Sequence, residues 1–325
     1  MTGSRQNRQE FLYLSSADIA ALAIGAGAIA DEIARASRAR AAGRVQIPPK
    51  IILRQENGAA FYAMTALAEG DGSVMKWLGN PSRNDAAGLP SFMGFMVVSD
   101  PKTGVPAALL SASDITAMRT AATSLLAARH LARQDAAVLG LAGCGAQARA
   151  HLTAIAREFP IRRVLLLGRS QTGIETMQEL ARTLGLAAEK VDGPEELIAQ
   201  SDIVVSSVPP DAIAAPFLDA RRLPAGAFVS MVDHGHSWTI EGLAPLGSLF
   251  TDDLAATADR ALVDPHLKRI PVSGDLTQIG GGFRRQSVDQ RIGFVFAGTA
   301  LADLAAANVI VRAARERGLG TALAL

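Results

Sequence analysis

The sequence predicts an α/β protein with two domains, a mostly antiparallel sheet near the N-terminus and a doubly wound parallel sheet in the centre. Short β-like runs separated by turn residues fill residues 50–111. From residue 136, apolar strands alternate with helical stretches, which is typical of a parallel sheet covered by helices on both faces. The chain has 325 residues, enough for two domains of roughly 150 residues each.

Composition and charge exclude several classes of protein. Hydrophobic residues make up 49% of the chain and aromatic residues only 5%, so the core must consist mainly of Ala, Leu, Val and Ile. The 32 Lys and Arg nearly balance the 31 Asp and Glu, so no global field favours nucleic acid or an anionic membrane. The single cysteine, Cys144, excludes an intramolecular disulfide and a cysteine metal cluster. We therefore expect a cytoplasmic protein with no nucleic-acid or membrane partner.

The N-terminal half begins with residues 16–40, which we expect to form one amphipathic helix with Ser16 as its N-cap. The apolar run inside it, residues 20–30, is too short and too interrupted by glycine for a membrane span. A helix over residues 113–131 is expected to link the two domains. Between these helices the strands are expected at residues 50–54, 60–65, 73–78, 92–99 and 106–111.

The second half alternates strands and helices. A last helix, residues 299–317, follows a glycine-rich region and can return to complete the first domain. The expected strands are residues 136–142, 163–167, 203–208 and 227–232, with helices at residues 147–158 and 172–184.

A glycine-rich loop joins the strand at 136–142 to the next helix. Gly143, Gly145 and Ala148 fit the pattern G-x-G-x-x-A. Glycines there let the backbone approach a pyrophosphate, whose charge is received by the free N–H groups of the helix start. We therefore expect a Rossmann-type dinucleotide site with Ala146 and Gln147 among its contacts, against the alternative that the glycines serve packing alone.

The next strand end bears on the choice of cofactor. NAD enzymes usually carry an acidic residue about 20 residues after the loop, for the ribose hydroxyls. Here the sequence has Arg169 and Ser170 and no carboxylate at that strand end. An arginine and a serine suit a 2′-phosphate, so NADP is favoured over NAD, although Arg169 can also cover the adenine or face water.

Several motifs together resemble the ornithine cyclodeaminase/mu-crystallin family, in order and over nearly the whole chain. The resemblance implies a discontinuous domain for substrate binding and dimerisation, residues 1–118 with 300–325. It also implies an NAD(P)-binding Rossmann domain, residues 119–299, a nicotinamide between the two, and a homodimer. The motifs are Lys76-Trp77-Leu78-Gly79-Asn80-Pro81, Asn84, Gly88-Leu89-Pro90, Asp100, Thr103-Gly104, residues 115–122 and residues 143–148.

The resemblance also assigns substrate-binding residues. Lys76 and Arg119 match the lysine and arginine that hold a substrate α-carboxylate, and an arginine can do so through two parallel hydrogen bonds. Without the family resemblance, Lys76 would be interpreted as a solvent-facing strand residue and Arg119 as part of a helix-surface ion pair. Lys50 stands where the family has a further arginine, and Met64 keeps the place of a pocket wall.

Further positions follow from the resemblance. Thr120 matches a residue close to the cofactor phosphates, and Ser207 and Val208 match the strand end under the nicotinamide half. Asp303 matches an aspartate close to the active site at the start of the last helix. It can equally be a first-turn acid that favours the helix N-terminus.

Residues 233–241 depart from the cyclodeaminase pattern. Gly235 stands where those enzymes have the aspartate that handles the substrate amine, which puts the ornithine-specific reaction in doubt. Asp233, His234 and His236 can instead manage a proton, or merely cap the strand end. No third or fourth ligand accompanies them, so we expect no metal. His130, His151 and His266 have no partner at a meaningful spacing.

Taken together, the sequence predicts an NAD(P)-dependent imine reductase or amino acid dehydrogenase that interconverts an α-imino acid and an α-amino acid. Its expected catalytic residues are Lys76, Asp233, His234 and Asp303. One alternative is ornithine cyclodeaminase, in which ornithine becomes proline and ammonia with bound NAD. Another is a non-catalytic, mu-crystallin-like protein that only binds the cofactor. The substrate side chain stays open.

Overall fold

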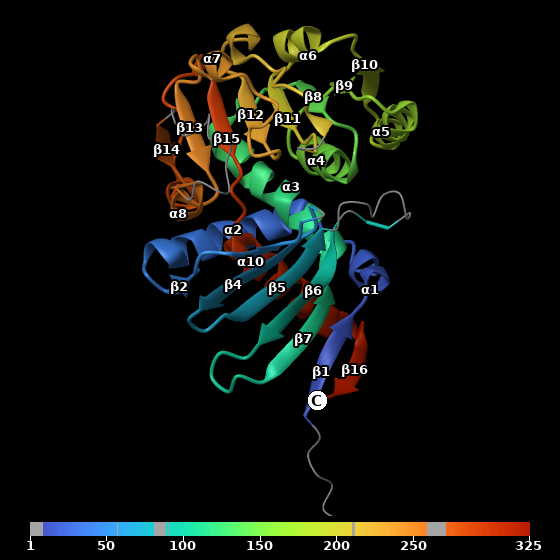
Figure 1. Cartoon of the computed structure of the whole chain (residues 1–325), viewed down its shortest axis with the longest axis vertical. Helices are drawn as coiled ribbons and strands as arrows, with labels where there is room; N and C mark the ends of the chain where they lie inside the picture. Colours follow the sequence, from blue (N-terminus) through green and yellow to red (C-terminus); the bar gives the residue numbers. More distant parts are fainter. Residues whose placement is uncertain (1–8, 57, 81–88, 91, 210–211, 259–270) are drawn as a thin grey trace, which may run out of the picture. The chain divides into compact units, whose positions relative to one another are not determined.

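The α/β class predicted from the sequence is confirmed. The computed structural model describes residues 9–56, 58–80, 89–90, 92–209, 212–258 and 271–325. The chain divides into two compact units (Figure 1). Unit 1 consists of Met1–Arg119 and Ala300–Leu325, and unit 2 of Thr120–Thr299. Among the described residues, no helix has the length and apolar character needed to cross a membrane.

Unit 1 contains an eight-stranded sheet in the order β16-β1-β7-β6-β5-β4-β2, with β3 paired to β4. Its central pairs are antiparallel as expected, whereas β1 runs parallel to β7. The strands are β1 (Glu10–Leu14), β2 (Val45–Gln46), β3 (Ile51–Arg54), β4 (Ala60–Ala68), β5 (Gly72–Asn80), β6 (Met93–Ser99), β7 (Pro106–Ser111) and β16 (Thr321–Ala324).

The strands β1, β2 and β16 were not predicted from the sequence. All four residues of β16 are exposed, so no alternation of polar and apolar residues marks it. It pairs with β1 antiparallel, and the two ends of the chain thereby lie side by side at one edge of the sheet.

The single helix expected at residues 16–40 is wrong. The structure has two helices, α1 (Ser16–Ala21) and α2 (Ala26–Ala41). Ala23 has a φ of 47° between them, and Gly25 is the N-cap of α2. The N-cap of α1 is Ser15, not Ser16, and it forms a capping box with Asp18.

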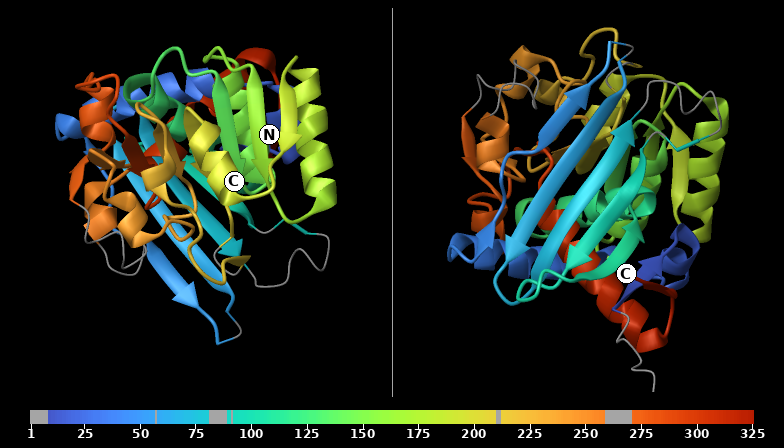
Figure 2. Two further views of the ribbon diagram at one scale, coloured as in Figure 1. Left: turned by 90° about the horizontal axis from the view of Figure 1, so that it is seen from above. Right: turned by 60° about the horizontal axis from the view of Figure 1, so that its bottom comes forward.

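Two long helices complete unit 1 and fix which face of the sheet is buried. The helix α10 (Ala300–Arg317) packs on β4 and β5 and on α2, on one face of the sheet (Figure 2). The helix α3 (Ala112–Leu131) follows β7, and the division between the units falls within it.

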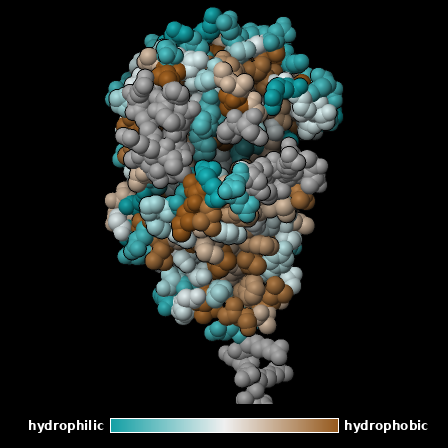
Figure 3. Space-filling model, in the orientation of Figure 1, coloured by the Kyte–Doolittle hydropathy of each residue, from teal (hydrophilic) through white to brown (hydrophobic). Residues whose placement is uncertain are grey.

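The opposite face of this sheet is apolar and exposed. Along β5, Val74, Lys76 and Leu78 are buried, while Met75 and Trp77 are exposed. Trp77 pairs across the sheet with Phe95 and stacks on Phe61. Figure 3 shows hydrophobic side chains gathered over the strands of unit 1. We call this set the outer apolar face: Ile51, Leu53, Leu67, Met75, Trp77, Met93 and Phe95.

Unit 2 contains an eight-stranded parallel sheet, β10-β9-β8-β11-β12-β15-β13-β14. The strands are β8 (Val138–Ala142), β9 (Arg163–Leu167), β10 (Ala187–Lys190), β11 (Ile203–Ser206), β12 (Phe228–Met231), β13 (Ser248–Thr251), β14 (Val272–Gly274) and β15 (Ile292–Val295). The helices are α4 (Ala146–Ala156), α5 (Gln171–Thr183), α6 (Pro194–Gln200), α7 (Ile240–Leu243), α8 (Leu254–Ala258), α9 (Leu276–Gly280) and a short 3₁₀ helix, Ala220–Arg222. The strands β10, β13, β14 and β15 were not predicted from the sequence.

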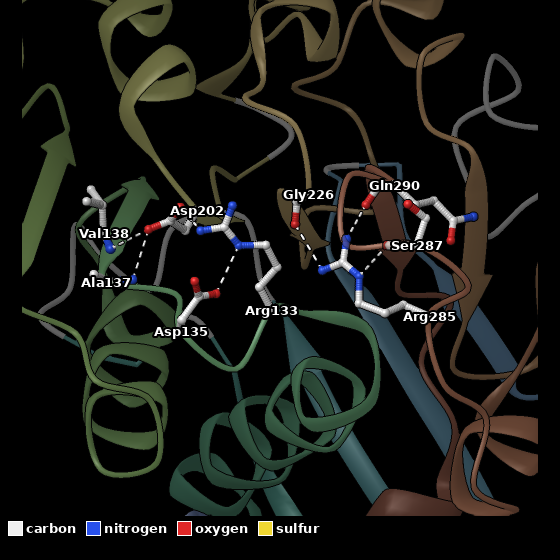
Figure 4. A network of polar contacts seen from close by, with 9 residues as sticks. All are labelled: Arg133, Asp135, Ala137, Val138, Asp202, Gly226, Arg285, Ser287 and Gln290. Carbon is white, nitrogen blue, oxygen red and sulfur yellow. Dashed lines mark hydrogen bonds and ion pairs between the residues drawn. The ribbon is translucent and has the colours of Figure 1, made fainter.

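Charged side chains hold the amino ends of the central strands together (Figure 4). Asp202 accepts hydrogen bonds from the N–H groups of Ala137 and Val138 and pairs with Arg133. Arg285 donates to the carbonyl oxygens of Gly226, Ser287 and Gln290. A cavity of about 860 Å³ lies here. Because both arginines are engaged by backbone and carboxylate groups, this network stabilises the sheet edge rather than marking an anion site.

The carboxyl ends of β8, β11 and β12 lie next to one another at the other edge of the sheet. Open parallel sheets bind their ligands beyond the carboxyl ends of their strands. The loops after β8, β11 and β12 are therefore the candidate cofactor-binding elements of unit 2.

A carboxylate also fixes the chain that follows β15. Asp252 accepts hydrogen bonds from the N–H groups of Ala297 and Gly298, both at 2.8 Å.

Candidate active site

A buried cluster of charged side chains lies in unit 1, between β5 and α10. The Nζ atom of Lys76 lies 2.8 Å from both carboxylate oxygens of Asp303. The Nε atom of Arg119 lies 3.2 Å from Oδ1 of the same carboxylate. The side chain of Lys76 is 1% exposed and that of Asp303 is fully buried. The structure therefore brings Asp303 into contact with Lys76 and Arg119, the two residues that the sequence predicted as a pair.

The electrostatics of this cluster favour a further negative charge. Burial, the neighbouring Arg119 and the charge of Lys50 lower the pKa of Lys76 to about 8, although Asp303 opposes this shift. Lys76 and Arg119 are two buried cations that both contact the carboxylate of Asp303. A substrate carboxylate would form charge-assisted hydrogen bonds with such cations.

The fold explains why these side chains meet. Lys76 lies in the middle of β5, on the face covered by α10, and Asp303 lies in the first turn of α10. Met64 pairs with Lys76 across β4 and β5 and is buried, which suits the pocket wall expected for it. Lys50 lies just before β3 and is partly buried.

The dinucleotide loop of unit 2 has the shape that a pyrophosphate requires. Gly143 has a φ of 95°, and a Cβ atom there would lie 3.1 Å from the backbone of Ser207. A Cβ atom on Gly145 would meet nothing within 4 Å, and this residue caps α4 without a side-chain hydrogen bond. The first N–H groups of α4, with Ala146 at its start, therefore point to a place where an anion fits.

Two buried polar atoms beside this loop have no hydrogen-bond partner among the described residues. They are Oε1 of Gln147 and Oγ of Ser207. Buried polar groups are normally paired, so an unpaired set at a glycine loop fits a ligand that completes it. These residues suit a dinucleotide. Val208 follows Ser207 and packs partly on the core, and Thr120 is buried in α3.

The end of β9 packs against the dinucleotide loop. A Cβ atom on Gly168 would lie 2.8 Å from Sγ of Cys144, so the thiol occupies the space beside this glycine. Arg169 is exposed, and Ser170 caps α5 by accepting a hydrogen bond from the N–H group of Gly173. The hydroxyl hydrogen of Ser170 and the guanidinium of Arg169 are therefore donors at this strand end. Burial raises the pKa of the Cys144 thiol to about 11, so it is unreactive.

Asp233 is buried at the end of β12 and organises the loop that follows. Its carboxylate accepts hydrogen bonds from the hydroxyls of Ser206 and Ser237, at 2.9 and 2.6 Å, and from the N–H group of Gly235. Burial raises its pKa, and these hydrogen bonds oppose the rise. The indole N–H of Trp238 donates to Ser206 and extends the network. This network with Ser206, Ser237 and Trp238 was not predicted from the sequence.

His234 occupies the left-handed region with a φ of 58°. Its Nδ1 atom lies 2.8 Å from the carbonyl oxygen of Phe296, so Nδ1 carries the hydrogen and Nε2 is the nitrogen that can exchange a proton. The ring of His236 lies 6.3 Å from that of His234, centre to centre. Among the described residues, no group of three or more His, Cys, Asp or Glu side chains could hold a metal ion.

Two histidines that the sequence analysis left without partners have them. His151 contacts Ser124 and Gln147, and His130 contacts the carbonyl oxygen of Phe283. Pro81, Asn84, Gly88 and His266 lie outside the described residues.

Replacement of Asp303 by Asn tests the charge balance of the cluster. The variant D303N leaves Lys76 and Arg119 buried with a neutral partner, which should lower the free energy of unfolding by about 3 kcal/mol. The pKa of Lys76 should fall below about 8, because its stabilising counter-charge is removed. Urea unfolding and NMR titration of the lysine measure the two effects. The control D192N changes an exposed carboxylate and should alter neither quantity.

Comparisons with known proteins place the chain in a family. Residues 12–317 match the model of the ornithine cyclodeaminase/mu-crystallin family. An alanine dehydrogenase of Archaeoglobus fulgidus is 26% identical over 96% of this chain and 98% of its own length. A Delta(1)-pyrroline-2-carboxylate reductase of Bacillus cereus is 26% identical over 79% of this chain and 82% of its own.

A solved structure is similar to this chain in fold. The structure of an archaeal alanine dehydrogenase dimer with bound NAD has a TM-score of 0.84 and is 26% identical, over 97% of this chain and 99% of its own. The relatives are dehydrogenases and reductases, so the prediction of an enzyme is confirmed. The chain belongs to the ornithine cyclodeaminase/mu-crystallin family.

Proposed function

We propose that this enzyme uses a nicotinamide cofactor, preferably NADPH, to reduce an α-imino acid to an α-amino acid. The observation that carries the proposal is the buried cluster in which Lys76 and Arg119 both contact the carboxylate of Asp303. A cation pair of this kind is suited to an α-carboxylate. The similarity to a reductase named for a cyclic imino acid supports the imine as the reactive group.

In this proposal Lys76 and Arg119 bind the substrate carboxylate and orient the imine carbon. Asp303 keeps Lys76 charged, since its carboxylate raises the pKa of the buried amine. Lys50 adds positive charge, and Met64 forms an apolar wall. Fixing the carboxylate converts a bimolecular encounter into an oriented one, which lowers the barrier.

Unit 2 holds the cofactor and supplies the proton group. Gly143, Gly145, Ala146, Gln147, Ser207 and Val208 would hold the cofactor, which supplies the hydride to the imine carbon. Thr120 would contribute to the phosphate end. His234 would hold or give a proton at Nε2 for the imine nitrogen, so imine, hydride and proton balance to an amine. Asp233 is treated as a positioning residue, because three donors engage its carboxylate.

The loop that follows β12 disfavours ornithine cyclodeaminase. That reaction needs a carboxylate near the substrate amine, whereas Gly235 stands at the expected place and the carboxylate of Asp233 accepts hydrogen bonds from the hydroxyls of Ser206 and Ser237. A protein that only binds a cofactor has no use for a buried carboxylate-binding cluster. Turnover separates all three functions.

The assay follows oxidation of NADPH and NADH with cyclic imines, and with α-keto acids plus ammonia or methylamine. Ornithine is tested in parallel. We expect oxidation with an imine, and kcat/KM should fall above about pH 8, because Lys76 loses its charge there. The variant R119A should lose at least ~100-fold in kcat/KM, about 2.7 kcal/mol, with cofactor affinity nearly unchanged.

The control variant is R182Q, which changes an exposed arginine and should keep full activity. Ornithine conversion to proline without net oxidation would contradict the reductase. An unchanged rate for R119A would remove Arg119 from the site.

For the cofactor, we propose that Arg169 and Ser170 bind the 2′-phosphate of NADP. The support is the exposed guanidinium next to a serine hydroxyl, in a strand end, residues 167–170, that has no carboxylate. The variant R169L should raise the KM for NADPH about tenfold, or roughly 1.4 kcal/mol, and leave that for NADH within twofold. Steady-state kinetics with both cofactors measures this. A wild-type enzyme that prefers NADH would contradict it.

We also propose that the outer apolar face binds a second copy of the chain. Exposed apolar patches of this extent mark interaction surfaces, and the sheet presents Met75, Trp77 and Phe95 side by side. The double variant M75E/F95E should convert a dimer to a monomer in light scattering at micromolar concentration. The control L254E adds a charge at an exposed leucine of unit 2 and should leave the dimer intact. A monomeric wild type would overturn the proposal.

A further inference from the structure

A chain of hydrogen bonds crosses the core of unit 2 behind the dinucleotide loop. Nε2 of His151 lies 2.8 Å from Oγ of Ser124, and this oxygen lies 2.8 Å from Oγ of Ser230. At the other side of the ring, Nδ1 of His151 lies 2.7 Å from the carbonyl oxygen of Gln147. All three side chains are fully buried.

The partners fix the direction of each hydrogen bond. The Gln147 carbonyl only accepts, so Nδ1 of His151 must carry the hydrogen and Nε2 must be the acceptor. The hydroxyl of Ser124 therefore donates to Nε2, and the hydroxyl of Ser230 donates to Ser124. Burial lowers the pKa of His151 to about 4, so the ring is neutral and this single arrangement holds at neutral pH.

The chain connects three elements that carry functional residues. Ser124 lies one helical turn after Thr120 on α3, so the two share a face. Ser230 lies on β12, three residues before Asp233. Gln147 lies in the first turn of α4, next to Gly145 and Ala146, and its own Oε1 is one of the buried atoms without a partner.

The chain does little for stability alone. A typical buried hydrogen bond contributes about 1 kcal/mol net, and apolar side chains of the same shape would be nearly neutral. What it adds is direction, because only one mutual placement of α3, α4 and β12 satisfies all of its members. This mutual placement orients the glycine loop at the start of α4.

We propose that His151, Ser124 and Ser230 form a positioning network that fixes the first turn of α4 and thereby sets the affinity for the dinucleotide. None of the three touches the reacting atoms. They act through the Gln147 backbone and the N–H groups of the first turn of α4. The proposal depends on the dinucleotide loop but not on the identity of the imine.

Direct binding of NADPH and NADH, followed by ligand fluorescence at 20 °C, tests the network without turnover. The variants S124A and H151L should raise the Kd about tenfold, because each removes a fixed hydrogen bond of the network. H151Q should lie closer to wild type, since its amide oxygen can replace Nε2 as the acceptor for Ser124. The kcat at saturating cofactor should stay within twofold.

The matched control is S201A. Ser201 is equally buried in unit 2 and donates one hydrogen bond, but to Leu197 within its own helix region. Its Kd should not change, although its Tm should fall as that of S124A does. Loss of Tm with unchanged Kd in S124A and H151L would show a merely structural role and overturn the proposal. Failure of the wild type to bind either nucleotide would overturn this proposal and the proposed function together.

The pH dependence gives a second readout. The folded-state pKa of His151, about 4, lies below its unfolded value of about 6.5, so the unfolded chain binds more protons between these values. This residue therefore makes stability rise with pH across that window, and stability is lost as pH falls through it. H151Q should show a flatter Tm profile from pH 6.5 to 4. An unaltered profile would contradict the buried neutral imidazole.

Discussion

The buried contact between Lys76 and Asp303 is the constraint on which unit 1 depends. A lysine in the middle of a strand, 1% exposed, would be too costly to bury without a carboxylate against it. That carboxylate comes from α10, 227 residues later in the chain. The chain must therefore return from unit 2 to complete the sheet domain. The same return brings β16 beside β1. The discontinuous domain thus follows from one ion pair as much as from hydrophobic packing.

One sheet of unit 1 serves two purposes because successive residues of a strand face opposite sides. On β5, Lys76 faces α10 and the charged cluster, while Met75 and Trp77 on either side belong to the outer apolar face. The same strand therefore presents a buried charged group on one face and an exposed apolar surface on the other.

The sequence predicted regular and locally encoded features best. The parallel sheet and the loop at Gly143 and Gly145 follow from local patterns, and the structure has both. Lys76 could not be oriented from its pattern, because apolar residues lie on both faces of β5, and only the family resemblance selected it. The break between α1 and α2 depends on Ala23 in an unusual conformation, which no propensity predicts. Ser206, a partner of Asp233, and Ser124, a partner of His151, each lie 27 residues away in the chain, so spacing alone could not find them.

Two polar networks in unit 2 meet at one strand. Ser230 of β12 ends the chain that starts at His151, and Asp233, just beyond the strand, holds Ser206 and Ser237. Buried polar networks add little net stability, but they restrict the backbone to one arrangement. Groups that bind a cofactor and move a proton work best when they are held in place before the ligand arrives. The end of β12 is held from both sides by these networks. These contacts, together with the hydrogen bond from Nδ1 of His234 to the carbonyl oxygen of Phe296, explain how the neighbouring His234 keeps a conformation that its backbone would otherwise avoid.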